Sequence, residues 1–232
     1  MIVKSFELNK KIADKHKFFL LYGKNEGLKN EIIQSLFLKD FEGQIDKYDE
    51  VEFLKNSEII INDLLNRSFF ESKKILIISR TSDKIFKTVE EIEERDMSDI
   101  KIIFKSGILE KRSKLRGYFE KNRNLITIPF YEDDVRSLTS VVIAFINKHK
   151  IKLSRESINL LVNRASGDRE NLKIELDKIL NYSFSNNKIE FEHIQKLTNL
   201  AENYGVNELA DSCLVRNRKK ISKILNENNY SD

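Results

Sequence analysis

Four short apolar runs and one weaker strand-like run, joined by segments with helical periodicity, constrain the first half of this 232-residue chain. Runs that are apolar on both faces are typical of strands buried between two layers of helices, which means a parallel sheet. The right-handed crossover rule then favours a doubly wound topology. We therefore predict an α/β fold with five parallel strands, at Phe18–Tyr22, Ile45–Tyr48, Lys74–Ser79, Lys101–Phe104 and Leu125–Ile128. Helices are predicted between them at 27–39, 58–67, 84–97 and 109–122.

The pattern changes after Pro129, where helical periodicity takes over. Ser154 is placed to cap one helix at its start, Gly167 to end that helix, and Asp168 to cap the next. We predict an α/β domain over 1–135, a small helical domain over 136–202, and the start of a third, truncated unit over 203–232. Two helices alone bury little core, so this last unit looks incomplete as it stands.

Charge and composition restrict the function only weakly. Lys and Arg number 41 against 37 Asp and Glu, giving a net charge of +4, which permits contact with nucleic acid without requiring it. Cys213 is the single cysteine, and no stretch looks like a signal peptide or a membrane span. We therefore expect a cytoplasmic protein. The histidines lie far apart with no cysteine partners nearby, so we expect no metal site.

A degenerate phosphate loop follows the first predicted strand. The segment Gly23-Lys-Asn-Glu-Gly27-Leu28-Lys29-Asn30 can be aligned with G-x-x-x-x-G-K-[ST], which cradles phosphates in ATPases. Lys29 falls on the lysine of that pattern. Leu28 replaces the second glycine, however, and Asn30 replaces the hydroxyl residue that binds magnesium.

The third predicted strand lacks the acid that an ATPase carries at this point. It ends in Ser79-Arg80, and the next carboxylate is Asp83. Two independent parts of the hydrolytic apparatus are thus missing. Three interpretations stay open here: Gly23 and Gly27 are plain turn residues, or the loop keeps weak nucleotide binding, or it hydrolyses ATP.

Three motifs in order resemble one known family. An apolar strand runs into Tyr22-Gly23, and the sequence Leu64-Leu65-Asn-Arg-Ser68-Phe69-Phe70 leads through basic residues into the strand at 74–78. Farther along, Gly167-Asp168 precedes a helix with Glu175-Leu-Asp-Lys-Ile-Leu180. In this order and spacing the chain resembles the delta subunit of the bacterial DNA polymerase III clamp loader, over nearly its whole length.

The resemblance implies an AAA+ architecture: a RecA-like α/β domain, a helical lid and a helical collar, of which most would be missing here. It implies a subunit that binds the ring-shaped sliding clamp (beta) and opens it for loading onto primed DNA. Other implied partners are the gamma/tau and delta prime subunits, with DNA contacted indirectly and no membrane. No cofactor and no intrinsic catalysis are implied, although the holoenzyme as a complex is a nucleotidyltransferase. The clamp-binding residues would be Leu65, Ser68, Phe69 and Phe70.

Other interpretations compete with this one. The chain could be a P-loop ATPase or nucleotide kinase with a degenerate loop, or a general DNA-binding protein, which would favour a larger charge excess. Phe69 and Phe70 could instead wedge a helix onto the sheet. The stretch 101–123 holds eight basic residues and two glutamates, which fits solvated helix faces or a DNA-facing strip. Arg169, near the position of a nucleotide-sensing arginine, is expected at the surface.

Overall fold

The computed structural model describes residues 1–65, 73–97, 99–186, 188–198 and 206–227. The chain divides into two compact units, Met1–Glu132 and Asp133–Asp232. The three-part division expected from the sequence stays a prediction. Within the described part of the chain, no helix is long and apolar enough to cross a membrane.

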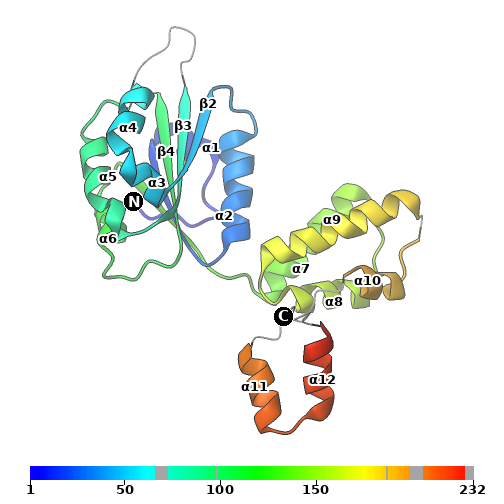
Figure 1. Ribbon diagram of the computed structural model, residues 1–232. Coiled ribbons are helices and arrows are strands. Elements are labelled where there is room, and N and C mark those ends of the chain that lie inside the picture. Colours follow the sequence, from blue (N-terminus) through cyan, green and yellow to red (C-terminus); the bar gives the residue numbers. More distant parts are fainter. Residues whose placement is uncertain (66–72, 98, 187, 199–205, 228–232) are drawn as a thin grey trace. The chain divides into compact units, whose positions relative to one another are not determined.

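The first unit is built on a five-stranded sheet with the order β2-β3-β4-β1-β5 (Figure 1). All four strand pairings are parallel, as the doubly apolar runs predicted. The strands are β1 (Phe18–Gly23), β2 (Gln44–Asp49), β3 (Lys74–Thr81), β4 (Ile100–Ser106) and β5 (Leu125–Phe130).

Helices cover both faces of this sheet, and a separate apolar cluster lies under each layer. One face carries α1 (Lys10–Lys15), α2 (Glu26–Ile32) and a π-helix, η1 (Ile33–Leu38). The other carries α3 (Glu50–Lys55), α4 (Ser57–Leu65), a 3₁₀ turn η2 (Asp83–Ile85), α5 (Phe86–Glu93) and α6 (Lys114–Lys121). Burial of both faces explains why β1, β3, β4 and β5 are largely apolar, whereas the edge strand β2 is mixed and mostly exposed.

Several helix boundaries differ from the predicted ones. The helix expected over 27–39 changes after Ile32 into the π-helical η1, and the helix expected over 84–97 ends as α5 at Glu93. The helix expected over 109–122 begins only at Lys114, because the Ser113 side chain caps the amide of Arg116. The short helices α1 and α3 were not predicted, since six residues are too few to show a period.

The second unit is helical. It contains α7 (Val135–His149), α8 (Arg155–Ala165), α9 (Arg169–Ser185), α10 (Phe191–Leu197), α11 (Val206–Leu214) and α12 (Arg218–Glu227). Apolar residues of α7 to α10 form one core. The predicted caps are present: Ser154 accepts from the Ser157 amide, and Asp168 accepts from the amides of Glu170 and Asn171. Gly167, at φ +84°, follows the end of α8.

Candidate functional site

The degenerate phosphate loop begins where β1 ends, and Gly23 is required there by sterics. Its φ is +126°, a conformation that other residues rarely adopt. A Cβ at this position would lie 2.0 Å from the carbonyl oxygen of Phe130. The Gly23 amide donates to the Gly107 carbonyl at 2.8 Å, which ties the end of β1 to the end of β4. Gly23 therefore lets three strand ends pack closely.

The amides of the loop are bonded within the chain. Asn25 caps α2, since its side-chain oxygen accepts from the Leu28 amide at 2.9 Å. Its Nδ2 donates to the Tyr131 carbonyl at 3.0 Å, and its own carbonyl accepts from the Lys29 amide at 3.1 Å. Gly27 lies in the first turn of α2. The amides of Leu28 and Lys29, which would lie near a phosphate in a working loop, thus have partners in the protein.

Lys29, the one matched lysine of the phosphate-loop pattern, is completely buried. Its Nζ donates to the carbonyl oxygens of Gly23 at 2.8 Å and of Ser106 at 2.6 Å, and it also bonds the carboxylate of Glu26. Burial lowers the pKa of Lys29, while the bond to Glu26 opposes that shift. Each of its three N–H donors has an acceptor within the domain, so the ammonium stabilises the packing of the domain interior.

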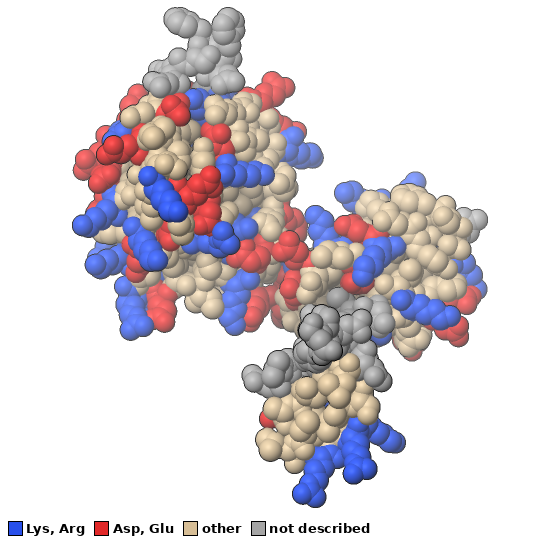
Figure 2. All heavy atoms as spheres, viewed as in Figure 1, with Lys and Arg blue, Asp and Glu red and all other residues tan. Residues whose placement is uncertain are grey.

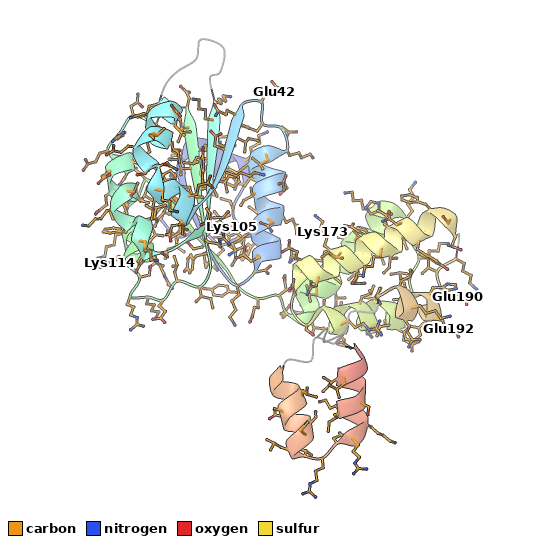
Figure 3. All side chains as sticks on the ribbon, viewed as in Figure 1. Glu42, Lys105, Lys114, Lys173, Glu190 and Glu192 are labelled. Atoms are coloured by element: carbon orange, nitrogen blue, oxygen red, sulfur yellow. The ribbon has the colours of Figure 1, made fainter. Side chains whose placement is uncertain are left out.

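Glu26 lies where this loop could otherwise hold an anion, between two ammonium groups. Its Oε2 is 3.1 Å from Nζ of Lys105, which also donates to Asn30 Oδ1 at 2.8 Å. Figure 3 shows Lys105 next to α2. Partial burial would raise the pKa of Glu26, but hydrogen bonds from Lys29 and Lys105 hold it below its usual range. A carboxylate of the chain itself therefore neutralises both lysines.

The end of β3 offers no acid in the position that an ATPase uses. Arg80 has a φ of +57° and pairs with Asp49, and the hydroxyl of Thr81 is bonded to that of Ser106. Asp83 caps α6: its Oδ1 accepts from Ser113 Oγ at 2.6 Å and from the Leu115 amide at 3.0 Å.

Partial burial would raise the pKa of Asp83, but these hydrogen bonds hold it below its usual range. The carboxylate nearest to the end of β3 in sequence is thus committed to a helix cap.

Together these contacts do not fit a magnesium nucleotide. The lysine is enclosed, the amides of Leu28 and Lys29 have partners, and Asn30 supplies an amide oxygen that already accepts from Lys105. Among the described residues, no three His, Cys, Asp or Glu side chains gather as metal ligands. The turn interpretation of Gly23 and Gly27 is the one that the geometry favours.

The predicted clamp-binding residues follow α4. Leu65, the last residue of that helix, is half-buried and packs against the core beneath it. Ser68, Phe69 and Phe70 lie outside the described residues. In the chain, the predicted segment follows the end of α4 at Leu65 and precedes the start of β3 at Lys74.

Arg169 is not a surface residue, and that prediction was wrong. Its Nε and one terminal amino group each lie 2.7 Å from a different carboxylate oxygen of Asp133. The Arg169 side chain is 13% exposed and that of Asp133 is 5% exposed. The pair joins the segment before α7 to the start of α9, a contact across 36 residues that sequence spacing does not reveal.

Sequence comparison supports the resemblance to delta subunits. No family model matches the chain. A probable DNA polymerase III subunit delta from Rickettsia prowazekii is 21% identical over 184 residues, which cover 78% of this chain and 56% of that protein. The chain thus spans little more than half the length of this relative.

Solved structures of related proteins share this fold. The clamp loader delta protein of Bacillus subtilis superposes with a TM-score of 0.55, at 18% identity over 94% of this chain and 68% of its own. The resemblance to the delta subunit family is confirmed. The RuvB branch migration motor of Thermotoga maritima gives a TM-score of 0.55 at 11% identity, covering 90% of this chain and 72% of its own. The AAA+ fold is therefore common to delta-like and motor proteins, and it does not by itself decide the function.

Sequence reasoning named Gly23, Gly27 and Lys29 but missed the residues that complete the cluster. Glu26, Lys105 and Ser106 come from the loop and from the end of β4, which the sheet order places beside β1. A carboxylate three residues before the lysine was the available signal, because residues at i and i+3 share a helix face.

Proposed function

We propose that this chain acts in DNA replication as a clamp-loader delta subunit. It binds the ring-shaped sliding clamp and opens one interface of the ring for loading onto primed DNA, without hydrolysing ATP itself. Its partners are the clamp (beta) and the gamma/tau and delta prime subunits, and it reaches DNA through the assembled loader.

The internal bonding of Lys29 is the observation that carries the non-hydrolytic part of this proposal. The delta-like sequence supplies the rest. A P-loop ATPase or nucleotide kinase needs this lysine at the β- and γ-phosphates. To reach them, Lys29 would have to leave two backbone carbonyls and a carboxylate in the domain interior. We therefore do not adopt that alternative.

A steady-state ATPase measurement tests the absence of hydrolysis. The purified chain is assayed alone, with a bacterial sliding clamp, and with the clamp and primed DNA. We expect no turnover above the blank under any condition. ATP turnover at about 1 per second, an ordinary enzyme rate, would contradict the proposal.

Clamp binding is tested at the predicted aromatic pair. A buried aromatic anchor at an interface contributes about 2–4 kcal/mol. Replacing both Phe69 and Phe70 with alanine should therefore weaken clamp affinity at least about thirtyfold, measured by surface plasmon resonance. Ile59→Ala is the matched control, because Ile59 is an exposed apolar residue on α4. It should change affinity less than about twofold.

Two outcomes would count against the aromatic site. If the double variant unfolds in a circular dichroism melt while the control stays folded, the phenylalanines belong to the core. If it stays folded and binds the clamp with unchanged affinity, the anchor lies elsewhere.

A further inference from the structure

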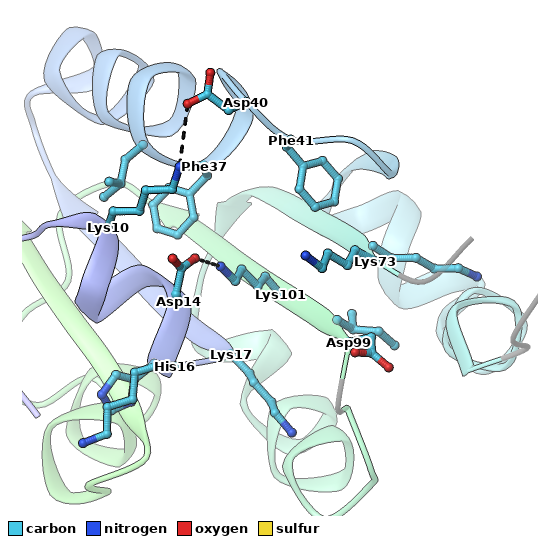
Figure 4. Close-up of a pocket in the computed structure, with 14 residues that line it drawn as sticks. Lys10, Asp14, His16, Lys17, Phe37, Asp40, Phe41, Lys73, Asp99 and Lys101 are labelled. Atoms are coloured by element: carbon cyan, nitrogen blue, oxygen red, sulfur yellow. Dashed lines mark hydrogen bonds and ion pairs between the residues drawn. The ribbon is translucent and has the colours of Figure 1, made fainter. Parts of the chain in front are cut away.

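A hollow of about 430 Å³ opens on the first unit at the edge where β1, β3 and β4 begin (Figure 4). This is the opposite edge of the sheet from the degenerate phosphate loop. It is lined by the end of α1, the end of η1 and the residues just before or at the start of the three strands. Pockets of a few hundred Å³ are typical of small-molecule sites.

The lining is basic. It holds six lysines, one histidine and three aspartates: Lys10, Lys15, Lys17, Lys73, Lys74, Lys101, His16, Asp14, Asp40 and Asp99. The face shown in Figure 2 has basic and acidic side chains interleaved over the first unit, so the charge excess of this hollow is a local feature. Such an excess in a concave site attracts anions.

Some of these lysines are neutralised and others are not. Nζ of Lys101 lies 2.9 Å from Asp14 and that of Lys10 lies 3.7 Å from Asp40, whereas Lys74 donates to the uncharged Asp63 carbonyl at 2.9 Å. In the described part of the chain, no carboxylate forms an ion pair with Lys15, Lys17 or Lys73. The pKa of Asp14 is held low by the hydrogen bond from Lys101, with a further contribution from Lys73 nearby. The acids of the hollow thus leave ammonium groups available to a ligand.

Aromatic surface lies beside these ammonium groups. The ring of Phe37 is buried and packs edge-on against Phe19, with centroids 4.9 Å apart. Phe41 is partly exposed on the same side. In Figure 4 Lys73 and Lys101 extend into the hollow with the ring of Phe41 above them. Ammonium groups next to an exposed aromatic ring suit a phosphorylated nucleotide. The base stacks on the ring, and the phosphate pairs with the ammonium groups.

We infer that this hollow binds a phosphorylated nucleotide, either free or as part of a single strand, with Lys73 at the phosphate, Phe41 against the base and Lys17 adding to the positive charge of the site. The inference is independent of clamp binding, because it uses other residues. It adds a direct nucleic-acid contact to a chain whose overall charge does not require one.

The test is binding of a fluorescently labelled oligothymidylate, followed by anisotropy at several salt concentrations. We expect the Lys17→Glu/Lys73→Glu double variant to bind at least about tenfold more weakly. The slope of log affinity against log salt should also fall by about 0.7 per lysine, the value for single strands. Lys84→Glu/Lys87→Glu makes the same charge change at exposed lysines of η2 and α5, on the other sheet face, and should alter affinity less than about threefold.

Competitors identify the source of the phosphate. Displacement of the labelled strand by thymidine monophosphate but not by thymidine supports a site for one nucleotide. Displacement only by unlabelled strand supports a strand-binding site. Lys73→Glu alone, at an exposed position, covers the case in which the half-buried Lys17 does not tolerate the change, and it should still weaken binding about threefold or more.

Three results would overturn the inference: no binding of the oligothymidylate, equal weakening in both double variants, or displacement by an acidic peptide as effective as by the strand. Equal weakening would mean that only net charge matters. Effective peptide competition would mean that the hollow takes a protein carboxylate.

Discussion

Lys29 and Lys73 lie at opposite edges of one parallel sheet and differ in burial and in bonding. Lys29 is fully buried at the edge where strands end, and its ammonium bonds two carbonyls and Glu26. Lys73 is exposed at the edge where strands begin, beside a hollow with an excess of positive charge. The sequence motif marks the first lysine as the ligand-binding one, whereas the geometry makes the second lysine the accessible one.

The largest expected effect is on Lys29. Lys29→Met preserves much of the side-chain volume but leaves the carbonyls of Gly23 and Ser106 without this donor and Glu26 with Lys105 as its ammonium partner. We expect the free energy of unfolding to fall by roughly 3 kcal/mol, because one partner of a buried charged network is removed. Urea denaturation followed by circular dichroism measures it. The free energy of unfolding of Lys73→Met should stay within about 0.5 kcal/mol of that of the parent chain. Equal stability of the two variants would contradict the difference drawn between the two lysines.

A smaller effect is expected at the glycine that shapes the loop. Gly23→Ala forces a Cβ against the Phe130 carbonyl at a positive φ and should lower the free energy of unfolding by about 2 kcal/mol. Gly107→Ala is the matched control, since a Cβ there meets nothing within 4 Å. Its stability, measured in the same urea titration, should equal or slightly exceed that of the parent. Destabilisation at Gly107 as large as at Gly23 would contradict this account.

The smallest effect concerns pH. The folded chain holds the pKa of Glu26 below its ordinary value of 4.5. Its contribution to stability is therefore present above about pH 4.5 and is lost as pH falls through the folded pKa. Because the side chain is 46% exposed, we expect less than about 1 kcal/mol. The thermal midpoint of Glu26→Gln should accordingly fall less between pH 6 and 3.5 than that of the parent chain. An equal fall in both would mean that Glu26 does not contribute to stability through these ion pairs.

The sheet was predictable because its signal is local. Four of the five strands are runs of apolar residues, whereas β2 is a weaker, mixed run, and the structure extends every predicted strand by one to three residues. Burial on both faces leaves no alternative pattern for such runs. Helix ends were less predictable: the start of α6 depends on Ser113 and on Asp83, thirty residues earlier.

The candidate sites were less predictable because they depend on packing between distant segments. Lys29 was found from its spacing, but its burial follows from Ser106, which lies 77 residues away. The hollow needs α1, η1 and three strand starts to come together, and no motif in the sequence marks it. Arg169 was misplaced for the same reason, since its partner Asp133 is known only from the fold. Phe69 and Phe70 stay a prediction.

The buried ammonium of Lys29 has a consequence for the evolution of this sequence. A lysine whose ammonium bonds groups in the interior of a domain is retained by selection for folding, whether or not it binds a phosphate. Returning this loop to ATP hydrolysis would need a glycine, a hydroxyl and a strand-end carboxylate, and also a new internal partner for each carbonyl that Lys29 now serves. No single substitution supplies these together, so under the proposed function a gain of ATP hydrolysis would need several changes at once.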